Sequence, residues 1–311
     1  MSDVSQSSVD SPQVTDPAPV VAPDPSCEAV PVRGPIGIIF ALRIEATRLL
    51  KRLEDKTTIL GRDVKITSGT LAGRSIVVAI SGPGAKAARR AATAMIDGHQ
   101  PRIVVASGLA GALERSLPLG RIVRPDLLVD AAGRRLAVDT FPAFEEDADS
   151  PPESLDEDKS LAMVTVDRVA SGPAAKAQLR EETGARSVDM ETFYTAEVCC
   201  REQVPFTVAR VIVDPLDREL PDDVEALLRA RSPMRQAGAA LRTLWRNPAR
   251  AKDLYLLKKE TDQALESLDA YLARLLGTYP VDVKSTDERQ KETGEPTADS
   301  LIDQIGPPRE V

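Results

Sequence analysis

Residues 187–214 read SVDMETFYTAEVCCREQVPFTVARVIVD, and this stretch decides the fold class. It begins with a short apolar strand at Ser187-Val188 and continues with a predicted helix over Glu191–Gln203. A valine-rich run, Phe206–Val213, follows as a second predicted strand and ends at an acid, Asp214. Strands that alternate with helices are typical of α/β proteins, so we expect an α/β fold.

The same alternation continues towards the N-terminus. The pattern predicts further strands at 36–41, 64–67, 75–80, 103–106 and 162–166. It predicts further helices at 45–53, 86–96 and 174–182. The strands on either side of Leu71-Ala72-Gly73-Arg74 are expected to pair as a hairpin, because this segment has the composition of a turn.

The chain divides into four parts. Residues 1–33 and 279–311 are rich in proline and polar residues, so they lack the apolar surface that a packed core needs, and we expect disordered tails. One domain is expected over 34–235, and a helical extension over 236–278. Within the domain, the acidic segment 145–158 is expected to be a solvated loop.

The extension contains a predicted helix over Arg250–Leu276 with an apolar stripe. The stripe is formed by Leu254, Leu257, Ala264, Leu265, Leu268, Leu272 and Leu275. Such a stripe usually packs on its own domain, and this is the packing that we expect; the alternatives are a second copy of the chain and a lipid surface. The mixed charges on the rest of the helix do not favour the lipid surface.

Composition excludes several classes of protein. The 311 residues carry a formal net charge of −8, which argues against nucleic-acid binding. No apolar run is long enough for a transmembrane segment, and the first residues lack the features of a secretory signal, so we expect a cytoplasmic protein. Three cysteines and the single His99, in a polar turn, favour neither a disulfide framework nor a metal site. Acid–base chemistry is therefore expected to use carboxylates.

Two glycine-rich segments follow predicted strands. Ser81-Gly82-Pro83-Gly84 precedes an alanine-rich helix, and Ser107-Gly108-Leu109-Ala110-Gly111 follows the strand at 103–106. Glycines let the backbone approach a ligand closely, but neither segment has the spacing of a P-loop or of a dinucleotide-binding turn. Ordinary tight turns explain both equally well.

Acids stand at the ends of three predicted strands. Glu45 follows the first strand, Asp189 and Glu191 flank Met190, and Asp214 ends the last strand. Ligands in open α/β sheets collect beyond the carboxyl ends of the strands, so these acids are candidates for catalysis. The alternative is that each acid caps the helix that follows it.

Five blocks, in this order, resemble the nucleoside phosphorylase superfamily, and within it the methylthioadenosine/S-adenosylhomocysteine nucleosidase branch. Residues 36–45 are similar to the pattern IGIIGAMxxE, and 81–86 to the SGIGK turn. The remaining blocks, 107–123, 188–191 and 204–214, resemble TGSAGGL…LxVGDIV, VEMEG/A and VPFxxxRxISD. The resemblance implies a central mixed β-sheet flanked by helices, with a C-terminal helical extension. Finer similarity, in VDME, in 214–221 and in the extension, is to the hopanoid-associated phosphorylase group.

The resemblance implies cleavage of the N-glycosidic bond of a 5′-modified purine nucleoside, with adenine as the expected base. Asp214 would be the general acid towards the purine N7, and Glu45 would deprotonate a water molecule. Glu191 would accept hydrogen bonds from the ribose, and Met190 would pack against the sugar.

The base would lie against the backbone of Ala110 and Gly111 and against Val169, within 168–170. Arg210 either steadies the end of the strand that carries Asp214 or forms a purely structural ion pair. The resemblance implies no metal and no cofactor, a small-molecule nucleoside as partner, and a homo-oligomer.

The nucleophile is either water or inorganic phosphate. Phosphate needs several cationic or amide donors, and the candidates are Arg43, Ser81 and Gly82. Glu45 favours water, so we expect hydrolysis. The alternative is phosphorolysis, for example of an adenosylated lipid such as adenosylhopane.

The chain departs from the branch's pattern at three positions. Phe40 replaces a glycine, Leu109 a serine, and Val213 the serine beside the catalytic acid, whose hydroxyl normally bonds that carboxyl. These departures suit a substrate with an unusual 5′ group. They suit equally a pocket that has decayed, and they are the basis of a rival interpretation, a module that senses a nucleoside without cleaving it.

Overall fold

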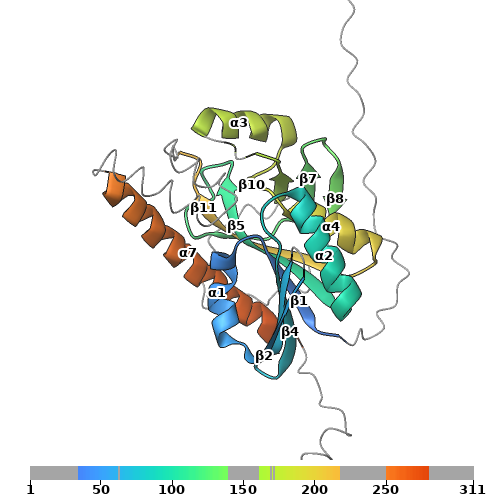
Figure 1. Ribbon diagram of the computed structural model, residues 1–311. Coiled ribbons are helices and arrows are strands. Elements are labelled where there is room, and N and C mark those ends of the chain that lie inside the picture. The colour runs from blue at the N-terminus through green and yellow to red at the C-terminus, as the bar shows by residue number, and fades with distance from the viewer. Residues whose placement is uncertain are drawn as a thin grey trace, which may run out of the picture.

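The computed structural model describes residues 34–61, 64–138, 161–168, 170, 172–217 and 250–279 (Figure 1). The strands in the described ranges are β1 (Ile36–Phe40), β2 (Glu54–Leu60), β3 (Lys65–Leu71), β4 (Arg74–Ile80), β5 (Ile103–Ala112), β6 (Ile122–Val123), β7 (Leu127–Asp130), β8 (Arg135–Ala137), β9 (Ala162–Thr165), β10 (Ser187–Asp189) and β11 (Phe206–Asp214). The helices there are α1 (Arg43–Arg52), α2 (Ala85–His99), α3 (Gly172–Thr183), α4 (Thr192–Arg201) and α7 (Arg250–Thr278).

All described strands belong to one mixed sheet, in the order β2-β3-β4-β1-β5-β10-β9-β7-β8, with β11 beside β5 and β6. The centre is apolar and parallel: β1 pairs with β4 and with β5, and β5 pairs along its length with β11. The carboxyl ends of β1, β5 and β11 therefore meet at one edge of the sheet. β10 runs antiparallel to the end of β5, with Val188 opposite Gly111, and so enters the same edge.

Helices cover both faces of the sheet, as Figure 1 shows. One face packs on α2 and α4 through a large cluster of alanines, valines and isoleucines. The other face packs on α1 and α7. Burial of these two apolar layers is the main stabilising contribution to the fold.

The apolar stripe of α7 packs on its own domain. Ala264, Leu265, Leu268, Leu272 and Leu275 are buried against β1, β4, β5 and β11. The prediction that the stripe would serve its own domain is confirmed for these residues. No helix in the described part of the chain is both long and apolar enough to cross a membrane.

The predicted mixed sheet and flanking helices are confirmed, but β2, β6, β7 and β8 were not predicted. β2 is an edge strand whose residues are all exposed, so it carries no apolar run. The sequence prediction was also wrong about 107–111, which is not a turn. These residues continue β5, because β11 pairs with them up to Gly111.

Several predictions lie outside the described residues. These are the tail 1–33, the acidic segment 145–158, the first part of the extension at 236–249, and 280–311.

Candidate active site

Glu45 is buried at the start of α1, where the chain turns back after β1. Its Oε2 atom accepts a hydrogen bond from the amide of Leu42 at 2.7 Å, and its Oε1 atom accepts one from the amide of Leu109 at 2.9 Å. Only 6% of the residue is exposed. Burial raises the pKa of Glu45, while the nearby Arg210 and the backbone amides act in the opposite direction. The result is a buried carboxyl that takes up a proton more readily than an ordinary glutamate.

Arg210 is wholly buried on β11, and its guanidinium is held by several groups. Nη2 lies 2.8 Å from Oδ2 of Asp189, and Nε donates to the hydroxyl of Thr192 at 3.0 Å. Nη1 lies 3.4 Å from the carbonyl oxygen of Leu109. Asp189 also accepts a hydrogen bond from the amide of Thr192 at 2.9 Å. Arg210 therefore ties β11 to β10 and to the start of α4.

Gly108 lies between Glu45 and Arg210. A Cβ atom at this position would stand 2.7 Å from Nη1 of Arg210 and 2.7 Å from Oε1 of Glu45. Its φ of 140° is also a conformation that residues with a side chain rarely adopt. Glycine is required at this position, because a larger residue would keep the carboxyl of Glu45 and the guanidinium of Arg210 apart.

Glu191 precedes α4 and is held by the glycine-rich turn that begins α2. Its Oε1 atom accepts a hydrogen bond from the amide of Gly84 at 2.8 Å. Burial, together with the neighbouring charge of Asp189, raises the pKa of Glu191 to about 7. The carboxyl therefore changes its protonation close to neutral pH.

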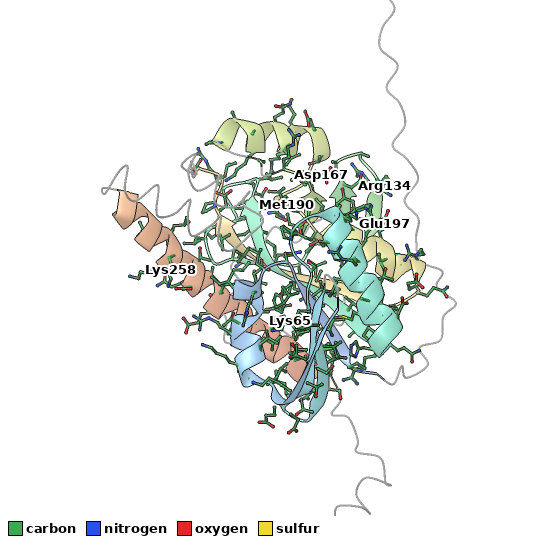
Figure 2. The ribbon with its side chains drawn as sticks, in the orientation of Figure 1. Lys65, Arg134, Asp167, Met190, Glu197 and Lys258 are labelled. Carbon is green, nitrogen blue, oxygen red and sulfur yellow. The ribbon has the colours of Figure 1, made fainter. Side chains whose placement is uncertain are left out.

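Met190 lies between these two acids in the chain and is half-buried. In Figure 2, Met190 is drawn in the region between α3 and the start of α2. Ala110 is buried, and Gly111 is half-buried near the last strand: a Cβ atom on Gly111 would lie 3.6 Å from Oδ2 of Asp214. Val169 lies outside the described residues.

Asp214 ends β11 and forms an ion pair with Lys176 of α3. The Nζ atom of Lys176 lies 2.8 Å from Oδ1 of Asp214 and donates a hydrogen bond to the carbonyl oxygen of Pro215 at 2.8 Å. The lysine side chain is 1% exposed, and that of Asp214 is 15% exposed. Lys176 was not predicted as a site residue, because nothing in its local pattern separates it from the other charged residues of the predicted helix.

The predicted phosphate contacts do not form a set of available donors. The hydroxyl of Ser81 lies 2.7 Å from the carbonyl oxygen of Gly82, and the amide of Gly82 donates to the carbonyl of Ala41. Arg43 is exposed on the first turn of α1. Ser81 and Gly82 are thus bonded within the protein, whereas Arg43 is exposed to solvent.

The three departures from the nucleosidase pattern all lie on the α7 side of the sheet. Phe40 is 0% exposed within the cluster that α7 covers, and Leu109 and Val213 pack against the same cluster. The ring of Phe40 is thus enclosed in the core, and its effect on the substrate stays a prediction. In the described ranges, no three His, Cys, Asp or Glu side chains gather as metal ligands would.

Comparison with known proteins agrees with this fold. The sequence pattern described as "Phosphorylase superfamily" matches residues 35–242. A 5′-methylthioadenosine/S-adenosylhomocysteine nucleosidase of Shewanella oneidensis is 30% identical over 210 residues, which are 62% of this chain and 89% of the relative. The chain therefore belongs to the phosphorylase superfamily and is an enzyme of it.

Solved structures show the same fold. The nucleosidase of the same name from Colwellia psychrerythraea, in complex with adenine, has a TM-score of 0.55 at 22% identity and covers 81% of this chain and 98% of its own. Futalosine hydrolase of Helicobacter pylori has a TM-score of 0.52 at 23% identity, with 78% and 98% covered. A nucleosidase and a futalosine hydrolase are thus among the proteins whose fold this chain shares.

Proposed function

We propose that the protein hydrolyses the N-glycosidic bond of a 5′-modified adenine nucleoside. The observation that carries this proposal is the environment of Glu45. Its carboxyl is buried beside Arg210, and that arginine is already paired with Asp189. This arrangement suits activation of a neutral water molecule better than binding of a phosphate dianion, because the dianion would face a buried carboxyl.

Glu45 acts as the general base. Leu42 and Leu109 fix its two oxygen atoms, so the carboxyl keeps one orientation while it takes a proton from the attacking water. Its raised pKa brings proton affinity closer to that needed at neutral pH. Hydrolysis needs no cofactor, since water supplies both the new bond to C1′ and the proton that Glu45 accepts.

Glu191 and Met190 bind the sugar. The second oxygen of Glu191 is left to accept hydrogen bonds from ribose hydroxyls when Gly84 occupies the first. Hydrogen bonds to a carboxylate are stronger than neutral ones, and they strengthen further as the sugar gains positive charge. Met190 supplies an adaptable apolar contact.

Asp214 stands at the end of the sheet where the base departs. The backbone of Ala110 and Gly111 lies beside it, and Val169 is the third proposed contact with the base. The purine leaves as a neutral molecule only when N7 is protonated as the bond to C1′ breaks, and Asp214 passes that proton.

The experiment is base release from methylthioadenosine, S-adenosylhomocysteine, 5′-deoxyadenosine and inosine, each with and without phosphate, followed by chromatography. We expect free adenine without phosphate. Release only with phosphate would replace hydrolysis by phosphorolysis. Failure to release any base, with adenine still bound in calorimetry, would identify a sensing module. The inosine arm tests the preference for adenine.

Two further expectations stay predictions. A homo-oligomer would be detected by light scattering on the purified chain, and a cytoplasmic location by cell fractionation. Neither is needed for the chemistry above.

A further inference from the structure

Lys176 is a buried lysine on a helix that is otherwise in contact with solvent. It is the one residue of α3 that the structure buries, and its side chain is 1% exposed. Removing an ammonium group from water is unfavourable by several kcal/mol unless other groups compensate for the lost hydration. The compensating groups are the Asp214 carboxylate and the carbonyl of Pro215, both at 2.8 Å, with the carbonyl of Asp214 at 3.5 Å.

Other charged groups on the neighbouring elements are engaged elsewhere. They are Arg180 on α3, Glu114 and Arg115 after β5, Arg186 before β10, and Asp217 after β11. Arg180 and Arg186 both pair with Glu114, and Arg115 pairs with Asp217 at 3.2 Å. Asp214 is thus the carboxylate that faces Lys176 among the described residues.

This geometry changes how the general acid has to work. An ammonium 2.8 Å from a carboxylate favours its ionised form, whereas a simple general acid needs the carboxyl to hold a proton. Both conditions are met if the transferable proton is shared between Lys176 and Asp214. Lysine ammonium with aspartate carboxylate, and neutral amine with carboxylic acid, hold the same single proton and the same net charge.

We propose, on the basis of the hydrolase function proposed above, that Lys176 is a positioning residue that acts through Asp214 and stores the proton destined for the purine. As the bond from C1′ to the base breaks, its electron pair passes to the base. N7 takes a proton from Asp214, and Asp214 takes one from the Lys176 ammonium, which becomes a neutral amine. Water adds to C1′ and loses a proton to Glu45, and solvent then restores both groups.

The residue before Asp214 supports this role. Val213 has no hydroxyl, and its side chain packs against the cluster under α7. The side chain at that position therefore cannot donate a hydrogen bond to the carboxyl. Lys176 of α3 instead places its ammonium 2.8 Å from Oδ1 of the same carboxyl.

The test is the pH dependence of kcat for adenine release, measured from pH 5 to pH 10 with the full chain and with three variants. In Lys176→Met, Asp214 must hold the proton without the lysine, so we expect kcat to fall and its alkaline limb to move at least one pH unit lower. In Lys176→Arg the charge is kept, but arginine does not release its proton, so we expect kcat to fall about 100-fold.

Arg180→Met is the matched control, because it removes a charge from the same helix without touching the pair. We expect its pH profile to follow that of the unsubstituted protein. An unchanged alkaline limb in Lys176→Met would overturn the proton-storing role and leave a structural ion pair. Retention of kcat within threefold in Lys176→Arg would overturn it too, because charge alone would then suffice.

The outcomes separate this proposal from the proposed function. An unsubstituted protein that releases no base from any nucleoside overturns the hydrolase function, and the proton-storing role with it. An active protein whose Lys176 variants keep the original pH profile overturns the role of Lys176 alone. If Lys176→Met does not fold, as judged by thermal unfolding, the profile of Lys176→Arg decides.

Discussion

The two ends of the proposed site differ in how their carboxyl groups are paired with cations. Around Arg210, three acids gather near one buried cation: Asp189 is paired with it, while burial raises the pKa of Glu45 and of Glu191. At the end of β11, Asp214 has a lysine of its own. The first region has more carboxyls than cations and so takes up protons readily, whereas the second balances one acid with one base.

The difference shows how a site with no histidine near its acids can divide proton uptake and proton delivery between them. Proton uptake from water falls to the acid-rich region, and proton delivery to the base falls to the balanced pair. Environment, rather than residue type, separates the two roles, because every acid involved is an ordinary aspartate or glutamate.

The largest effect is expected from substituting Asp214, which delivers the proton to the purine. Asp214→Asn keeps the size of the side chain but cannot pass a proton from Lys176 to N7, so kcat should fall by about 10³-fold. Adenine binding, measured by calorimetry, should survive. A variant with kcat within tenfold of the unsubstituted protein would show that the proton reaches the base by another route.

Glu45→Gln removes the general base that takes a proton from water, and it should lower kcat by about 10²-fold. Glu45 acts as a general base only when its carboxyl is ionised, so activity in the unsubstituted protein should rise with pH as Glu45 loses its proton. Because the pKa of Glu45 is raised, this rise should occur above the ordinary range of a glutamate. The acid limb of the kcat profile should disappear in the variant. Persistence of that limb would assign it to another group.

Glu191→Gln tests the acid-rich region around Arg210 through substrate binding and protein stability. We expect KM to rise about tenfold, since one charged hydrogen-bond acceptor is lost to the ribose.

Stability should also respond to pH at Glu191. The unfolded glutamate titrates near 4.5 and the folded one near 7, so the folded state binds the extra proton between these values. The stability of the unsubstituted protein therefore falls as pH rises from about 4.5 to about 7, by about 3 kcal/mol from this group. Urea unfolding of Glu191→Gln should lack this fall. An identical pH dependence in both proteins would place the raised pKa on another acid.

The smallest effect on catalysis is expected from the apolar stripe of α7, which packs on the sheet. Leu268 is 1% exposed, so Leu268→Ala should lower the free energy of unfolding by about 2–5 kcal/mol while kcat of the folded enzyme stays within twofold. Leu256, which is 49% exposed on the same helix, is the matched control, and its alanine variant should change stability by less than about 0.5 kcal/mol. A large loss of kcat in folded Leu268→Ala would mean that α7 positions the site.

Much of the fold could be predicted because its signals are local. The apolar runs of β1, β5 and β11 and the helical spacing in α2, α4 and α7 repeat within a few residues. Edge strands such as β2 could not be predicted, since their residues are exposed on both faces and show no apolar pattern. The extension of β5 through Gly108 was equally hidden, because its glycines resemble a turn until β11 is placed beside them.

The sequence by itself determined the α/β class, the family resemblance and the acids at the strand ends. It could do so because periodic apolar runs and the position of an acid directly after a strand are properties of neighbouring residues. Only the tertiary structure decided how these acids are partnered: Arg210 with Asp189 beside Glu45, and Lys176 with Asp214. Such pairs join residues that are far apart in the chain, so their geometry arises when the strands align and the helices pack, and no local pattern records it.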